Sequence, residues 1–299
     1  MRQILAKLLC CFIPGKENRR KVRDALSRNK YDIILEKITK LHERIDVISK
    51  NVDFANGQIL SITKDPLFFG NLNIKGNGNV ILIWNEDVKD YVPLLQSKPG
   101  LFIDIDGDNN TIKIGCPQII ERLNIFIHGN GHEFSIGKYT KKFKGHVISP
   151  TICLLNTKAP CKIIIGDNAN INKDVLFVCN ESNTQIIVGN NCRFAEGVAI
   201  WSSDSHAIVD TKTNKILNKS PGQIRIGDWC WCGYRSYLGK NTVLPNYTVV
   251  GAKSVVTKPF TQEYTVIAGN PAKVIKTGVR HYDERADCTF QELEELSNS

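Results

Sequence analysis

The feature that most constrains this chain is a six-residue period between Ile226 and Val255. Each unit has an aliphatic residue or Cys at the first place, Gly or Pro at the second and a small residue at the fifth. Six residues are enough for one short strand and one corner, so three units close a triangular coil of about 18 residues. The period therefore predicts an all-β fold, a parallel β-helix. Its first two places are Ile226-Gly227, Cys232-Gly233, Leu238-Gly239, Leu244-Pro245 and Val250-Gly251, and its fifth places are Cys230, Ser236, Thr242, Thr248 and Ser254.

An ordinary β-sandwich is the alternative fold for a chain of short, recurring strands. Turn signals in a sandwich usually come about every 8 to 12 residues and drift, whereas these arrive every six without slipping. With 299 residues and 42% hydrophobic content, the chain can bury a sizeable core as one long solenoid. The β-helix is therefore the favoured interpretation.

The sequence divides into four segments. Residues 1–50 predict a helical extension, and residues 279–299 a short acidic helix. Residues 54–160 are rich in Asn and Gly and repeat an aliphatic-x-Gly pattern, which predicts irregular coils of the same solenoid, with loops at 84–100 and 138–150. Residues 161–278 carry the regular β-helix.

The basic charge is concentrated in the leader. Residues 1–30 hold nine Lys or Arg against two acidic residues, and so carry +7 of the formal net charge of +9. An amphipathic stretch followed by a basic run suits peripheral contact with an anionic membrane, but it also suits a helix packed on the protein. The apolar stretch is too short to cross a bilayer, and it lacks the cleavage pattern of a signal peptide. Nucleic-acid binding is a poorer interpretation, because aromatic residues are not interleaved with the basic ones as base stacking requires.

A second helical signal follows the leader. Apolar residues recur at spacings of three and four, as in the seam of a short coiled coil. Two to three heptads could join subunits or could cover the end of the solenoid, and both interpretations remain open. The apolar positions are Tyr31, Ile34, Ile38, Leu41, Ile45 and Ile48.

The ten cysteines are scattered and contain no Cys-x-x-Cys pair. Several occupy expected strand positions, so we interpret them as small buried hydrophobic residues in a reducing compartment. The six histidines do not cluster with them, and we expect no metal site.

The six-residue count breaks at His206. Twenty residues, 206–225, intervene before Ile226 restarts the count, so a polar loop is expected to leave the solenoid directly after this histidine. Loops held by a rigid scaffold commonly carry catalytic groups. His206, together with Asp204 and Trp201, is therefore the candidate functional site.

Four stretches of the chain resemble the hexapeptide-repeat, left-handed β-helix acyltransferases. The resemblance is to the branch of galactoside, maltose and nodulation-factor acetyltransferases and to capsular sialic-acid O-acetyltransferases. It covers roughly residues 161–278. The stretches are Ile226-Gly227-Asp228, Trp231-Cys232-Gly233, residues 250–258 (VGAKSVVTK) and residues 267–276 (IAGNPAKVIK).

The resemblance implies a homotrimer with acetyl-coenzyme A between adjacent β-helices. His206 inherits the role of general base, the backbone N–H of Tyr234 that of oxyanion donor, and Asp204 either orients His206 or recognises a hydroxyl. Asn170, Trp201 and Arg235 are expected on the acceptor side. The implied cofactor-binding residues are Trp231, Gly233, Gly251, Ala252, Lys258, Lys273 and Lys276.

Two departures from the family pattern concern the acceptor. Ala207 replaces the usual Pro, and Tyr234 and Arg235 replace small residues. The family's acceptor class and the basic amphipathic leader together predict a cytoplasmic O-acetyltransferase, peripheral at the inner membrane, that acetylates a sugar hydroxyl of a bacterial surface glycan such as capsule, lipooligosaccharide or sialic acid. A small free acceptor (sugar, amino acid or drug) and a catalytically silent β-helix scaffold are the alternatives.

Overall fold

The computed structural model describes most of the chain after residue 51. It gives the backbone of residues 52–55, 58–62 and 67–68, and backbone and side chains of residues 72–94, 100–140, 147–155, 157–282, 289–291 and 293. The predicted helical extension at 1–50 and most of the tail at 279–299 lie outside these residues.

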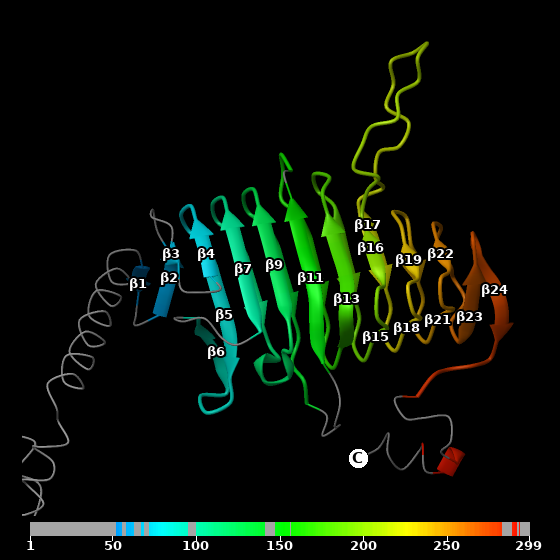
Figure 1. The fold of residues 1–299 in the computed structure, drawn as a ribbon, viewed down its shortest axis with the longest axis horizontal. Coiled ribbons are helices and arrows are strands. Elements are labelled where there is room, and N and C mark those ends of the chain that lie inside the picture. The colour runs from blue at the N-terminus through cyan, green and yellow to red at the C-terminus, as the bar shows by residue number, and fades with distance from the viewer. Residues whose placement is uncertain are drawn as a thin grey trace, which may run out of the picture. The chain divides into compact units, whose positions relative to one another are not determined.

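The described residues are almost entirely β-structure (Figure 1). The first eleven strands, with one short 3₁₀ helix η1 (Pro117–Ile119), are β1 (Val52–Ala55), β2 (Gln58–Ile62), β3 (Leu67–Phe68), β4 (Leu72–Lys75), β5 (Val80–Asn85), β6 (Asp90–Pro93), β7 (Leu101–Asp106), β8 (Thr111–Ile114), β9 (Leu123–His128), β10 (Glu133–Ile136) and β11 (Ile148–Leu155). The later strands are β12 (Lys162–Ile165), β13 (Asn170–Cys179), β14 (Gln185–Val188), β15 (Arg193–Phe194), β16 (Ala199–Trp201), β17 (Gln223–Ile226), β18 (Trp231–Cys232), β19 (Tyr237–Leu238), β20 (Val243–Leu244), β21 (Val249–Val250), β22 (Val255–Val256), β23 (Thr265–Gly269) and β24 (Ala272–Thr277).

The strand pairings confirm the predicted parallel β-helix. In the regular coils each strand pairs in parallel with the third strand after it: β17 with β20, β18 with β21 and β19 with β22. The paired residues Trp231 and Val249 are 18 positions apart, as are Tyr237 and Val255. Three strands therefore close each regular coil. The left-handed winding remains a prediction.

The earlier coils are longer, and their strands belong to the same sheets. Thr111 pairs with Glu133, Glu133 with Lys162 and Lys162 with Gln185, so successive coils advance by 22, 29 and 23 residues. Parallel pairing runs without interruption from β5 to β20 in the eight-stranded sheet. In the 14-stranded sheet, β9 and β11 before residue 160 join β13 after it, so the irregular and regular coils share this sheet too.

Alternation along each strand builds the core. In β9 the buried residues are Leu123, Ile125 and Ile127, while the residues between them are partly exposed. The small residues at the fifth places are buried at the corners, where the Oγ1 atoms of Thr242 and Thr248 donate to the Gly239 and Pro245 carbonyls at 2.7 and 2.8 Å. Removal of these aliphatic side chains from water is the main driving force for the fold.

Close stacking of the coils explains two of the glycines. At Gly107 φ is +148°, and a Cβ would lie 2.0 Å from the Gly129 carbonyl oxygen of the next coil. At Gly233 a Cβ would lie 2.6 Å from the Val250 oxygen. No side chain fits at either place, which accounts for the Gly in the repeats.

One of the expected loops is partly a strand pair. We predicted that residues 84–100 leave the solenoid as a loop, but β5 and β6 pair antiparallel through residues 82–93. The four-residue strand β6 forms the edge of the eight-stranded sheet, and it carries no six-residue signal.

The described residues also bear on the state of the cysteines, on metal binding and on membrane-spanning helices. Among the described cysteines all are free thiols, and all except the half-buried Cys153 are buried. The described part of the chain holds no group of three or more His, Cys, Asp or Glu side chains arranged to bind a metal ion. Within that part, no helix is both long enough and apolar enough to span a bilayer.

Candidate functional site

The solenoid opens between β16, which ends at Trp201, and β17, which begins at Gln223. The intervening chain first makes a tight corner and then an antiparallel hairpin, which we call the arm, residues 207–219. Figure 1 shows the arm projecting beyond the ends of the neighbouring strands. The predicted break after His206 is therefore confirmed in position.

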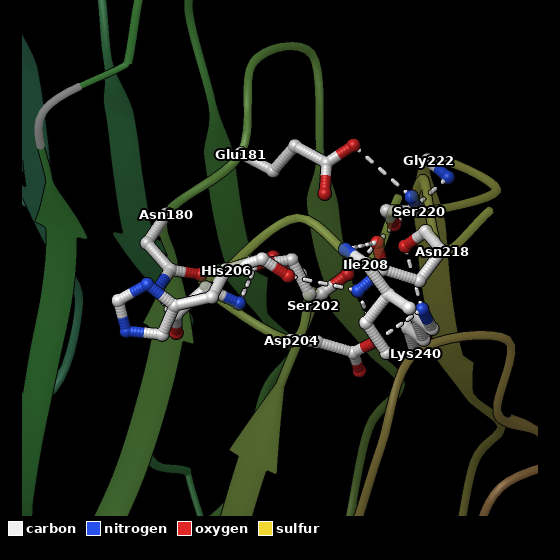
Figure 2. Close-up of polar contacts among 12 residues, drawn as sticks. Asn180, Glu181, Ser202, Asp204, His206, Ile208, Asn218, Ser220, Gly222 and Lys240 are labelled. Carbon is white, nitrogen blue, oxygen red and sulfur yellow. Dashed lines mark hydrogen bonds and ion pairs between the residues drawn. The ribbon is translucent and has the colours of Figure 1, made fainter. Parts of the chain in front are cut away.

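His206 is exposed at the root of the arm. Its N–H donates to the Asp204 carbonyl at 2.8 Å, and its own carbonyl accepts from the Asn218 Nδ2 at 2.8 Å. These bonds hold the backbone while the imidazole points away from the Asp204 carboxylate (Figure 2). The residue lines a cavity of about 260 Å³ together with Asn180, Glu181, Ser203, Asp204, Ser205, Ala207, Ile216, Asn218 and Lys219.

Asn180 fixes the corner that presents His206. The Ser203 Oγ donates to the Asn180 Oδ1, and the Asn180 Nδ2 donates to the Ser205 Oγ, each at 2.6 Å. Ser205 has a φ of +66°, a left-handed conformation that costs free energy for a non-glycine residue and is held here by the surrounding bonds. Sequence reasoning missed Asn180, which directly follows β13 one coil earlier and carries no motif.

Asp204 is bound to groups other than the imidazole. Its Oδ2 accepts from the Lys240 Nζ at 2.5 Å and from the Asn218 Nδ2 at 2.8 Å. The hydrogen bond from the Lys240 ammonium, followed by that from Asn218, lowers the pKa of Asp204 below its usual value. In this structure Asp204 therefore anchors the arm to the next coil.

A second cavity, of about 420 Å³, lies on the other side of Asp204. Tyr237, Gly239, Lys240 and Thr257 contribute to its wall, along with Leu217 of the arm. Burial, with a smaller effect of the Asp204 charge, raises the pKa of Tyr237. Asp204 and Asn218 belong to both cavities, so the two hollows meet at the root of the arm.

Most of the predicted cofactor residues lie on another face of the coils. Trp231 is 43% exposed, and it pairs with Val249, which pairs with Val266. Val266 in turn faces Lys276 across the antiparallel β23–β24 pair. Trp231 and Lys276 therefore belong to one row across the sheet.

Four of the remaining predicted cofactor residues lie next to this row, whereas Lys258 follows β22 and adjoins Thr257 of the second cavity. Gly233 and Gly251 donate their N–H groups to the carbonyls of Val250 and Ile267, each at 2.8 Å. Ala252 is exposed at the next corner, and Lys258 lies with its Nζ 5.6 Å from the Phe260 ring centroid. Lys273 is exposed on β24, opposite Ala268.

His281 is a residue of this face that sequence reasoning missed. After β24 the chain turns back at Gly278, and the Val279 N–H donates to the Tyr264 carbonyl at 3.0 Å. The His281 ring then lies 6.0 Å from the Trp231 ring, tilted by 48°. Only the fold-back of the chain beyond β24 brings these residues together, so no local pattern could have indicated the contact.

The predicted acceptor residues are spread over several places. Trp201 ends β16 and pairs with Val178, close to the His206 corner. Asn170 begins β13, ten residues before Asn180, and pairs with Arg193. Arg235 has a φ of +52°, and its guanidinium lies 5.0 Å from the Tyr234 ring.

His206 and Tyr234 lie at opposite ends of β19. Tyr234 precedes the strand, whereas Gly239 and Lys240, which share a cavity with Asp204, follow it. The Tyr234 carbonyl accepts from the Lys253 N–H at 2.8 Å, and no partner is found for the Tyr234 N–H within the described chain. A single chain therefore brings His206 and Asp204 together, but not Tyr234 with them.

Comparisons with known proteins bear on the fold. No protein-family model matches the chain. The polySia-specific acetyltransferase NeuO is similar in structure, with a TM-score of 0.55 and 24% identity over 66% of this chain and 85% of NeuO. The polysialic acid O-acetyltransferase OatWY is similar with a TM-score of 0.50 and 23% identity over 66% of this chain and 99% of OatWY. At these identities the likeness shows a shared β-helical fold.

Proposed function

We propose that this chain is an O-acetyltransferase that moves an acetyl group from acetyl-coenzyme A to a sugar hydroxyl of a surface glycan, with sialic acid as a candidate acceptor. The observation that carries the proposal is the exposed imidazole of His206 at a cavity where the solenoid breaks its count. The fold shared with NeuO and OatWY supports an acyl-transfer reaction, and the printed names of those proteins motivate the glycan acceptor.

The cavity around His206 suits a hydroxyl-rich ligand. Its wall holds the Asn180 amide, the Glu181 carboxylate and the hydroxyls of Ser203 and Ser205. These groups both donate and accept hydrogen bonds, as recognition of a sugar requires. Histidine is also the side chain best suited to exchange a proton near neutral pH.

The row from Trp231 to Lys276 suits the donor. An exposed indole offers an apolar surface to the pantetheine arm, and the Lys273 and Lys276 ammonium groups offset phosphate charge. Between Glu263 and Asp283 the sequence contains no acidic residue. Acetyl-coenzyme A is therefore the proposed cosubstrate on this face.

The proposed reaction is direct transfer without an acyl-enzyme. His206 takes the proton of the acceptor hydroxyl as its oxygen attacks the thioester carbonyl, and the Tyr234 N–H of a neighbouring copy stabilises the oxyanion. Collapse of the tetrahedral intermediate breaks the C–S bond, and the imidazolium returns the proton to the departing thiolate. Because Tyr234 and His206 lie at opposite ends of β19, this scheme uses two copies, and we propose the homotrimer implied by the resemblance.

The basic leader completes the proposal. Residues 1–30 carry +7 of the chain's net charge, and each Lys or Arg near an anionic bilayer contributes about 1 kcal/mol of attraction. We propose that this segment holds the enzyme peripherally at the inner membrane, near lipid-linked glycans.

Mass spectrometry of a glycan library incubated with acetyl-coenzyme A tests the proposal. Wild-type protein should add about 42 Da per acetyl group to a glycan, and His206→Ala should lower the rate by about 10²- to 10⁴-fold. Lys212→Ala, on the exposed tip of the arm, serves as a matched control and should keep the wild-type rate.

Three outcomes count against the proposal. If only free sugars, amino acids or drugs gain the mass, the acceptor is a small molecule. If wild type and His206→Ala are equally inactive and coenzyme A does not protect the protein from unfolding, the scaffold interpretation is favoured. Equal activity of wild type and His206→Ala would remove the general-base role.

A further inference from the structure

One ammonium group lies where the His206 cavity and the second cavity meet. Lys219, the last residue of the arm, lines both of them. Its side chain is exposed, and within the described part of the chain no hydrogen bond or ion pair engages its ammonium group. Binding sites use a few placed polar or charged groups of this kind to orient a ligand. Lys219 is therefore available to an anionic group in either cavity.

The other lysine at this junction already has its partners. The Lys240 Nζ donates to the Asp204 carboxylate at 2.5 Å and to the Asn218 carbonyl at 2.6 Å. A ligand would have to break these bonds in order to reach Lys240. Of the two lysines in the cavity walls, Lys219 is the one that a ligand can engage without such a cost.

The backbone on both sides of Lys219 is held by side chains from other segments. Directly before it, the Asn218 Oδ1 accepts from the Ile208 N–H at 2.7 Å. Directly after it, the Ser220 N–H donates to the Glu181 Oε1 at 3.0 Å (Figure 2). Only the side-chain torsions of Lys219 therefore remain to be ordered when a ligand binds, which lowers the entropic cost of binding.

The charges in the cavity walls favour a ligand group with a single negative charge. The walls hold two carboxylates, Glu181 and Asp204, and two ammonium groups, Lys219 and Lys240. A singly charged anion can pair with Lys219, whereas a phosphate monoester, with a charge of about −1.5 to −2, also meets stronger repulsion from the two carboxylates. A carboxylate is therefore the better partner for Lys219.

We propose that Lys219 determines the specificity of the acceptor site by pairing with a carboxylate of the glycan, and that the second cavity holds the sugar unit next to the one that is acetylated. The inference rests on the proposed function, in which the reacting sugar occupies the His206 cavity. It adds a second subsite and names the charged group by which the protein distinguishes an acidic glycan from a neutral one.

The sizes of the two cavities agree with two adjoining subsites. Sites for drug-sized ligands measure about 300–1,000 Å³, so the His206 cavity, at about 260 Å³, is too small for a glycan of several units. The second cavity, at about 420 Å³, shares Lys219 with it and also contains Tyr237 and Thr257. These two residues bring an aromatic ring and hydroxyl groups, which suit a sugar.

Calorimetric titration with sialic acid oligomers tests the proposal without any need for turnover. The matched ligand is the same oligomer with each carboxylate converted to a neutral amide. Wild type should bind the acidic oligomer at least tenfold more tightly than the amide. Lys219→Gln should lose about tenfold or more in affinity for the acidic oligomer only, as expected for loss of a charge-assisted hydrogen bond.

Two variants serve as controls. Lys215→Gln removes another exposed ammonium group of the arm, one that lines neither cavity, and should keep the wild-type affinities. Lys219→Arg keeps the positive charge and should keep the preference for the acidic oligomer. In acetyl transfer, Lys219→Gln should raise the KM for the acidic oligomer about tenfold or more and leave kcat and the KM for acetyl-coenzyme A unchanged.

Several results would overturn the proposal. Equal affinity of wild type for the two oligomers would do so, and so would equal losses in Lys215→Gln and Lys219→Gln, which would indicate a general effect of charge. A rise in the KM for acetyl-coenzyme A alone would assign Lys219 to the donor phosphates instead. Acetyl transfer to glycans with a KM that Lys219→Gln leaves unchanged would contradict this inference alone. Absence of acetyl transfer, with the binding preference and its dependence on Lys219 intact, would contradict the proposed function alone.

Discussion

At the residue scale, Asp204 illustrates how neighbours in space decide the role of a side chain. Its place two residues before His206 suggested contact with the imidazole or with the acceptor. The carboxylate instead accepts hydrogen bonds from Lys240 and Asn218, which come from the next coil and from the arm. Neither residue belongs to a recognisable motif, so only the coordinates reveal the pair.

The Asp204–Lys240 pair gives a pH-dependent contribution to stability. The Lys240 ammonium, followed by Asn218, lowers the folded-state pKa of Asp204 below its ordinary value of 3.8. The stabilisation is therefore complete above pH 3.8, at neutral pH for example, and is lost as the pH falls through the lower folded-state pKa. Since the Lys240 side chain is 24% exposed and the Asp204 side chain 40% exposed, we expect the pair to contribute less than about 1 kcal/mol to the free energy of unfolding.

A double-mutant cycle measures this contribution. Urea unfolding of Asp204→Asn, Lys240→Met and the double variant, followed by circular dichroism, should show a coupling free energy that is smaller at pH 3 than at pH 7. A coupling that is the same at both pH values would show that the charge of Asp204 does not contribute.

At the element scale, the stacking of the irregular coils depends on glycines. Gly107 has a φ of +148°, and a Cβ there would meet the Gly129 oxygen at 2.0 Å. Gly107→Ala should therefore lower the free energy of unfolding by about 1–3 kcal/mol for the backbone conformation alone, and by more for the clash. Gly278→Ala is the matched control, because its φ is +72° but nothing lies within 4 Å of the new Cβ. Equal melting temperatures for the two variants would contradict this view of the stacking.

Much of the fold could be predicted at this scale because six-residue units interact with their nearest neighbours. The alternation of inward aliphatic residues and the Gly at corners are local properties, so the register of Trp231 with Val249 follows from counting 18. The break at His206 was visible for the same reason. The arm was not, because four aliphatic residues among polar ones, in pairs rather than in sixes, carry no periodic signal.

The candidate site was less predictable than the fold. His206 became a candidate because it stands where the repeat breaks, and Trp231 because of the family resemblance. Asn180 and His281 could not, since each contact depends on a corner one coil away or on a chain reversal. Their roles follow from coil stacking, which positions side chains that are far apart in the sequence.

At the scale of the whole molecule, the fold separates the groups that the proposed reaction needs. His206 lies at the corner after β16, whereas Trp231 and Tyr234 lie before β19. In the proposed reaction, one chain would therefore supply half of each of two sites, and a ring of copies would join the halves at each junction. Activity should then depend on assembly, and two inactive chains should be able to repair one another.

Mixing of variants tests this expectation. His206→Ala removes the proposed base, and Trp231→Ala, which changes an exposed side chain, removes the proposed donor contact. In co-assembled protein a junction is intact when the Trp231→Ala chain supplies His206 and the His206→Ala chain supplies Trp231. Random assembly of equal amounts makes about a quarter of the junctions intact, so the mixture should regain about a quarter of wild-type transfer at low acetyl-coenzyme A. If both groups acted within one chain, each chain would remain defective, and the mixture would show only the average of its two parents.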